Sequence, residues 1–169
     1  MTSGDNVLHL LEIAPPATLF ATPDEINGGS TPAEKIPCWD FDDTSAEYLD
    51  FRVLLDPNYS GGGLTLTLPW SSGAATSGQA RLGAAFRRIA DDAEDLNSSH
   101  SYAYNDSSET TASAAGEVQY STITFTDGAD MDNLAAGEIA ILRIRRAPTH
   151  GDDDLVGDVE LHLPFCKET

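Results

Sequence analysis

The sequence predicts an all-β fold, an antiparallel two-sheet β-sandwich of the jelly-roll type. Apolar and polar residues alternate through most segments after Cys38, which places successive side chains on opposite faces of a strand. The intervening segments are rich in Gly, Ser and Asp, as turns require. Roughly seven or eight short strands with such connections and few helices are typical of a sandwich.

Length and charge limit the partners. A chain of 169 residues is long enough for one domain with a hydrophobic core. Its 28 acidic side chains outnumber 9 basic ones, giving a formal charge of −19, so phosphate backbones and anionic membranes should repel it. We therefore expect no nucleic-acid partner and no membrane partner. The start "MTSGDNVLHLLEIAPP" has the pattern of neither a signal peptide nor a membrane span.

Residues 1–37 differ from the rest. This segment holds five of the nine prolines, and proline lacks the backbone donor that a central strand needs. We interpret residues 1–37 as an extended proline-rich N-terminal arm and residues 38–169 as the β-sandwich domain. Within the arm, "VLHLL" (7–11) is expected to pair as a short strand with the domain or with a neighbouring subunit.

Period-two alternation then predicts the strands one by one. Residues 46–55 form a half-buried strand, and residues 64–70 put alternate leucines and Trp70 inward. Residues 79–90 fit a helix or a strand; because Gly83 costs a helix about 1 kcal/mol, a strand is favoured. Further strands are expected at "SYAYN" (101–105), 117–126, 138–147 and 155–165, the last with Leu155, Val159, Leu161, Leu163 and Phe165 on one face, and a helical turn is expected to end near Gly137.

No motif indicates catalysis. The four histidines show no metal-ligand spacing, and neither GxSxG nor another nucleophile frame is present, so we expect no enzyme, no cofactor and no metal-dependent chemistry. Two acidic runs have spacing that permits calcium, although neither matches an EF-hand loop. The alternative for both is helix capping and turn formation. These runs are Asp127, Asp130 and Asp132, and Asp152, Asp153 and Asp154.

The two cysteines permit a single bridge. Cys38 and Cys166 lie near the two ends of the predicted sandwich domain, and first and last strands often lie side by side. A Cys38–Cys166 disulfide is therefore possible. Two buried free thiols are the favoured interpretation.

The arginines lie in predicted strands, whereas acidic residues crowd the loops. If Arg143 and Arg145 share an outward face near Arg87, that sheet carries a local positive patch suited to an intersubunit or shell contact. Pairing within the chain, with Asp50 or Glu138 on neighbouring strands, is an equal alternative.

Three stretches carry a resemblance to a known family: "NYSGGGLTLTLPWSSGAATSGQARLGAAFRRIADDAEDL", "GEVQYSTITFTDGADMDNLAAGEIAILRIRR" and "GDVELHLPF". Residues 38–166 resemble a tailed-bacteriophage virion family of small jelly-roll β-sandwich proteins similar to capsid decoration or cement proteins. The family usually has a bulky residue near Gly83 and "EVR" where this chain has "HLPFCKE". The resemblance implies no catalytic residue.

The leading functional hypothesis follows from that resemblance. It implies a structural virion protein that binds the major capsid protein on the outer surface of a phage head, as a homotrimer, after assembly in the host cytoplasm. Deleting residues 1–35 is then expected to weaken shell binding and leave the β-domain folded. The candidate capsid or intersubunit contacts are Arg87, Arg143, Arg145, Trp39 and Tyr59.

The alternative is a tail-fibre or receptor-binding sandwich that recognises carbohydrate. Aromatic side chains stack on sugar rings, and Trp39, Tyr59, Tyr102 and Tyr104 are the candidates for this role. Packing in the core or at a trimer interface is the competing explanation for the same four aromatics.

Overall fold

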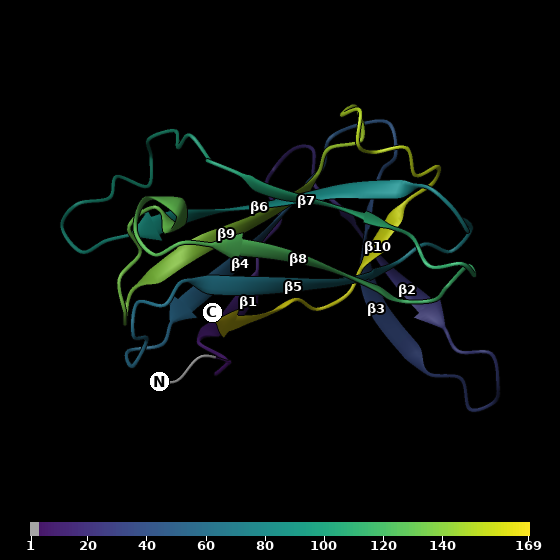
Figure 1. Cartoon of the computed structure of the whole chain (residues 1–169), viewed down its shortest axis with the longest axis horizontal. Helices are drawn as coiled ribbons and strands as arrows, with labels where there is room; N and C mark the ends of the chain where they lie inside the picture. The colour runs from purple at the N-terminus through teal and green to yellow at the C-terminus, as the bar shows by residue number, and fades with distance from the viewer. Residues whose placement is uncertain (1–3) are drawn as a thin grey trace.

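The computed structural model describes residues 4–169 and confirms the all-β prediction: two antiparallel sheets pack face to face (Figure 1). One sheet has the order β1-β4-β9-β6-β7, and the other has the order β11-β5-β10-β3-β2, with β8 paired to β5. The strands are β1 (Leu8–Ile13), β2 (Thr22–Asn27), β3 (Lys35–Phe41), β4 (Tyr48–Leu55), β5 (Leu64–Ser71), β6 (Gln79–Ile89), β7 (Asn105–Thr110), β8 (Gln119–Phe125), β9 (Ile139–Arg146), β10 (Val159–Leu161) and β11 (Phe165–Glu168).

The connectivity is that of a jelly roll. Strands β3 to β6 pair in reverse order with β10 to β7, so that β3 meets β10, β4 meets β9, β5 meets β8 and β6 meets β7. The chain is thus a long hairpin rolled into a sandwich, in which most consecutive strands belong to opposite sheets. Strands β1 and β7 are the edges of the first sheet. In the second sheet β2 lies at one end, and β8 and β11 each pair with β5 alone among the named strands.

The core lies between the inward faces of both sheets. Strand β5 supplies the buried side chains of Leu64, Leu66, Leu68 and Trp70, as alternation predicted. The indole Nε1 of Trp70 donates a 2.9 Å hydrogen bond to Ser121 Oγ, so its polar atom is satisfied within the core. Each such large apolar side chain contributes about 1.5–3 kcal/mol by leaving water.

The N-terminal segment is part of both sheets. Strand β1 pairs with β4, β2 pairs with β3, and Val7, Leu8 and Ala21 are buried in the core. The "VLHLL" prediction of a strand paired with the domain is therefore met. Residues 8–13 and 22–27 are therefore strands of the sandwich rather than parts of a separate arm, and deletion of residues 1–35 would uncover core residues.

Three local expectations differ from the structure. The strand predicted at 101–105 lies at 105–110 instead, where β6 supplies the pairing that the polar sequence would not favour alone. The helical turn is a single 3-10 turn at Ala129–Met131. Leu163 and Phe165, expected on the inner face, are 65% and 37% exposed, because the chain between β10 and β11 leaves the regular alternation.

No helix in residues 4–169 is long and apolar enough to cross a membrane.

Candidate functional site

Four arginines lie on the outer face of the first sheet and hold down the connection between β6 and β7: Arg81 and Arg87 of β6, and Arg143 and Arg145 of β9. The Arg87 guanidinium donates to Glu94 (2.9 Å) and to the carbonyls of Asp95 and Ser98. Farther along, the connection lays Tyr102 over Arg143, with 4.2 Å between guanidinium carbon and ring centroid. Cation–π contacts of this kind, with the paired carboxylates, fix the segment on the sheet.

Carboxylates balance these arginines within the chain. Arg143 donates two 2.7 Å hydrogen bonds to Asp50 across the β4–β9 pair. Arg88 makes a similar pair with Glu138, at 2.6 and 2.7 Å. The structure therefore shows the arginines paired with carboxylates of the same chain, which was the alternative to a contact between subunits. This pairing neutralises the expected positive patch. A role for Arg87, Arg143 or Arg145 in contacts between subunits stays a prediction.

Arg145 and Asp106 form the centre of the candidate site. Arg145 Nη2 lies 3.0 and 3.2 Å from the two oxygens of Asp106, and Arg81 Nη2 lies 3.1 Å from the same carboxylate. The ring of Tyr104 stacks on Arg145, 3.8 Å from its guanidinium carbon. Burial raises the pKa of the Tyr104 hydroxyl to about 12, so this side chain is a neutral donor and acceptor.

Gly83 makes this arrangement possible. A Cβ atom at residue 83 would lie 2.2 Å from Asp106 Oδ1 and 3.0 Å from Arg145 Nε. Strand β7 can therefore place its carboxylate across β6 only because residue 83 has no side chain.

A polar groove opens beside this cluster, between the free edges of β7 and β8. It encloses about 400 Å³. Asn105 crosses its floor and donates a 2.8 Å hydrogen bond to the Thr124 carbonyl. Two buried polar atoms next to it, Arg145 Nε and Ser108 Oγ, have no hydrogen-bond partner among the described residues. The groove is lined by Arg81, Tyr104, Asn105, Asp106, Ser107, Thr122, Ile123 and Thr124.

The remaining aromatic candidates lie elsewhere. Trp39 is half-buried and packs against the core at the other side of the sandwich. Tyr59 also packs on the core, where its hydroxyl contacts Asp127 (3.0 Å) and accepts from the Gly63 amide (2.8 Å). The structure therefore brings Tyr104, Arg145 and, beside them, Tyr102 and Arg143 together, and it leaves Trp39 and Tyr59 apart from them.

Neither acidic run forms a calcium cage. Asp130 accepts from Thr126 and Asn105, Asp132 accepts from the Arg88 amide, and Asp127 from Tyr59. In the second run, Asp152 pairs with Arg81, Asp153 with Arg146, and Asp154 with the Gln79 amide. Their carboxylates face different partners, so turn formation and internal pairing explain both runs.

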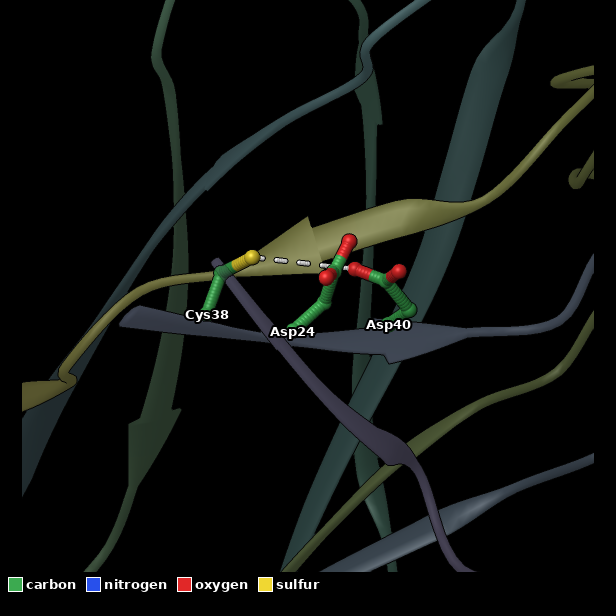
Figure 2. Close-up of side chains that lie close together, drawn as sticks. All are labelled: Asp24, Cys38 and Asp40. Carbon is green, nitrogen blue, oxygen red and sulfur yellow. Dashed lines mark hydrogen bonds between the residues drawn. The ribbon is translucent and has the colours of Figure 1, made fainter. Parts of the chain in front are cut away.

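The structure brings together two aspartates and a cysteine, and the spacing of these residues in the sequence did not predict that they are close. Strand pairing sets Asp24 opposite Cys38, and Asp40 follows two residues later, so one ligand atom of each lies within 4.8 Å of the others (Figure 2). The Cys38 thiol lies 3.7 Å from Asp40 Oδ1, in donor geometry. Burial and nearby carboxylates raise the pKa of Cys38 to about 12, so the thiol is protonated near neutral pH and can donate to Asp40. A second such group is Asp42, Asp43 and Asp158.

The possible disulfide does not form. Cys38 and Cys166 are both buried free thiols. Trp39, next to Cys38, pairs with Leu161, and Leu161 in turn pairs with Trp70 on β5. Cys166 pairs with Leu66, which lies four residues before Trp70 on the same strand. At about 3.3 Å per residue this offset exceeds the reach of a disulfide.

One serine has a histidine and a carboxylate nearby without forming a nucleophile frame. Ser71 Oγ lies 2.7 Å from Glu160 Oε2 and 3.1 Å from His162 Nε2. In a catalytic triad the acid contacts the other ring nitrogen of the histidine, but His162 Nδ1 is buried without a partner in the described chain. Since Ser71 is also fully buried, these residues form a structural hydrogen-bond group.

No model of a protein family matches the chain, and no curated protein matches it in sequence. Among solved structures, the chain is similar to the carbohydrate-binding module TmCBM61 in complex with β-1,4-galactotriose, at 10% identity and a TM-score of 0.39 over 94% of this chain and 88% of that one. A likeness of that degree places no ligand on this chain.

Proposed function

We propose that the protein is a carbohydrate-binding β-sandwich module whose ligand lies in the polar groove between β7 and β8. The observation that carries this proposal is the composition of the groove walls. Guanidinium, amide, hydroxyl and carboxylate groups of Arg81, Asn105, Thr122 and Asp106 converge on one cavity. A sugar, which offers hydroxyl donors and acceptors on every side, satisfies both kinds of group.

The charge balance of the groove favours a neutral ligand. Arg81 and Arg145 are matched by Asp106 and by Asp152, which accepts a 3.1 Å hydrogen bond from Arg81. A phosphate or carboxylate ligand would compete with these carboxylates for the same donors, in a protein of charge −19. An uncharged polyhydroxylated ligand meets no such repulsion.

Tyr104 is the aromatic residue in the lining of this mainly polar groove, and its contact with Arg145 fixes the orientation of its ring before a ligand arrives. Rigid aromatic and paired charged side chains lower the entropy cost of binding. Apart from Tyr104, which ends the β6–β7 connection, the groove is built from residues on β6, β7 and β8.

A glycan array of neutral oligosaccharides, followed by calorimetric titration of the strongest hit, tests this proposal. We expect Tyr104→Ala to weaken binding about tenfold, the scale of one aromatic contact. Thr122→Val should also weaken binding because it removes a groove hydroxyl. The matched controls are Tyr120→Ala and Thr65→Val, which make the same changes outside the groove. If no neutral glycan is bound, or if the control variants lose as much affinity, the proposal is wrong.

The role on a virion stays a second proposal, supported by an adjoining surface that shares Thr122 and Thr124 with the groove. The outward residues of β5, β8 and β11 form a face without acidic side chains on this acidic protein. Tyr120 and Phe165, 58% and 37% exposed, meet edge to face there with centroids 6.4 Å apart. A protein shell would meet least charge repulsion on this face. Its residues are Thr65, Thr67, Pro69, Tyr120, Thr122, Thr124, Phe165 and Lys167.

Light scattering and binding to expanded phage capsids that lack the protein test this second proposal. A trimer that saturates the shell and raises its disruption temperature supports it, and Tyr120→Asp should then abolish binding. If the protein does not bind capsids but binds glycan in a Tyr104-dependent way, this second proposal is wrong and the carbohydrate-binding function is supported.

A further inference from the structure

A second, apolar cleft lies at the opposite side of the sandwich from the sugar groove. Trp39 of β3 and Phe51 of β4 come from different sheets and both line it. The cleft encloses about 320 Å³, within the range of roughly 300–1,000 Å³ that is common for ligand sites. Its lining consists of Ile13, Pro37, Trp39, Phe51, Leu161, His162 and Leu163.

Large apolar side chains are exposed at the mouth of this cleft. Leu163 is 65% exposed and Ile13 is 39% exposed, and Leu11, two residues before Ile13 on β1, is 58% exposed. Isolated exposed apolar residues are common, but Leu163 and Ile13 line a cavity that is itself apolar. The cleft and its rim together form a continuous apolar surface.

Acidic residues border the same surface. An adjoining cavity of about 550 Å³ shares Ile13, Pro37 and Trp39 with the cleft, and it reaches Asp24 and Glu25 on β2. Asp40 lies beside Asp24 and Cys38 (Figure 2). Strands β2, β3 and β10 carry Asp24, Glu25, Asp40 and Glu160 against the single cation Lys35.

These carboxylates repel one another. Burial and the charges of Asp24, Glu160 and Asp158 raise the pKa of Asp40 to about 6. Lys35 relieves only Glu25, through a 2.8 Å ion pair. A positively charged group that binds beside these carboxylates would therefore be attracted to them.

The cleft also lies between strands with unpaired edges. Strand β1 ends the first sheet and β2 ends the second, and both contribute residues to the adjoining cavity. An extended polypeptide fits such a gap better than a compact surface does. A second copy of this chain does not fit, because it would bring a charge of −19 against these carboxylates.

We infer that the Trp39 cleft docks an extended basic segment of a partner protein, with one large apolar side chain of that segment seated against Trp39 and its lysines or arginines beside Asp24 and Asp40. The apolar anchor supplies affinity, and the charges supply orientation and association rate. This inference is independent of the sugar groove, which lies between other strands.

Fluorescence anisotropy with two labelled peptides tests this inference. The probe is a lysine peptide with one central phenylalanine, and the comparison peptide has alanine in place of the phenylalanine. We expect the phenylalanine peptide to bind at least about tenfold tighter, as a seated anchor requires. Asp24→Asn should weaken both peptides.

The variant Leu163→Asp separates docking from simple charge attraction. It adds a negative charge at the cleft rim, so non-specific attraction of lysines would increase, whereas an anchored peptide would lose its apolar contact. Docking predicts weaker binding of the phenylalanine peptide to Leu163→Asp and unchanged binding to Tyr120→Asp, which makes the same kind of change on another exposed face. Equal binding of the two peptides, or tighter binding to Leu163→Asp, would overturn the inference. Self-association of the wild-type chain that Leu163→Asp abolishes would also overturn it, by showing that a second copy fills the cleft.

Discussion

Asp106 reaches Arg145 across Gly83, and both oxygens of its carboxylate accept from the Arg145 guanidinium, at 3.0 and 3.2 Å. The same carboxylate accepts from Arg81. One acid on the edge strand β7 thus joins side chains from the next two strands, β6 and β9, and the sugar groove opens beside it. This relationship depends on a residue that has no side chain.

Substitution of Gly83 by alanine should therefore separate the strands locally. The new Cβ would meet Asp106 Oδ1 at 2.2 Å, so the Asp106–Arg145 pair would have to move. We expect Gly83→Ala to lower the free energy of unfolding by about 1–3 kcal/mol and to weaken glycan binding. Urea unfolding measures the first effect. Gly151→Ala is the control, because nothing lies within 4 Å of its Cβ position; equal stability of the two variants would show that residue 83 has room.

The buried pair of Arg146 and Asp153 should be sensitive to the loss of one partner. Both side chains are almost fully buried, with Nη2 and Oδ1 3.0 Å apart, and Arg146 also donates to the carbonyls of Phe41, Leu155 and Gly157. Arg146→Met leaves a buried carboxylate unpaired, which should cost about 3–5 kcal/mol. Adding Asp153→Asn should restore part of that loss. A double-mutant cycle measures the coupling, and additive effects would contradict it.

Asp40 should make the protein less stable as the pH rises from 4 to 6. Its pKa is raised from 3.8 to about 6 in the folded chain, so between these values the folded state holds a proton that the unfolded state has released. Stability is therefore lost across this window. Asp40→Asn should flatten this part of the pH profile and raise stability at neutral pH. Urea midpoints at several pH values test this, and parallel profiles for wild type and variant would count against it.

Both thiols should be inert in the folded protein. Burial raises the pKa of Cys38 and of Cys166 to about 12, so neither forms a thiolate near neutral pH. We expect no reaction with a thiol-specific reagent until urea unfolds the chain, and no effect of a reducing agent on the unfolding midpoint. A midpoint that falls on reduction would reveal a bridge.

The N-terminal segment should be required for stability. Leu8 is 3% exposed within the core, whereas Leu11 on the same strand is 58% exposed. Leu8→Ala should cost about 2–5 kcal/mol and Leu11→Ala far less. Thermal unfolding compares the two variants. Equal, small effects would mean that β1 detaches from β4 in solution.

The strands that could be predicted from the sequence are those in which apolar and polar residues alternate. In β4, β5, β8 and β9 apolar side chains alternate toward one core, so period two was sufficient. Strand β7, with the sequence "NDSSET", has no such signal, because its pairing with β6 decides its conformation. The two exposed residues Leu163 and Phe165 were misassigned because alternation was extended through a break between strands.

The sites depended on contacts between distant segments. The notable concentration of arginines in strands was visible in the sequence, and so were Tyr102 and Tyr104, but which arginine each tyrosine covers depends on the path of the β6–β7 connection. The cluster of Asp24, Cys38 and Asp40 follows from the register of β2 against β3, which no spacing encodes. Gly83 could have been noted as a point of close approach, since glycine within a strand often marks one.

Amide chemical-shift mapping with the strongest glycan from the array tests the central claim most directly. The account predicts that saturation with this neutral oligosaccharide shifts the amides of residues 104–107 and 122–124, on the two sides of the groove, and that Tyr104→Ala raises the glycan concentration needed for half of these shifts about tenfold. Shifts centred on Trp39, or none at any concentration of glycan, would contradict it.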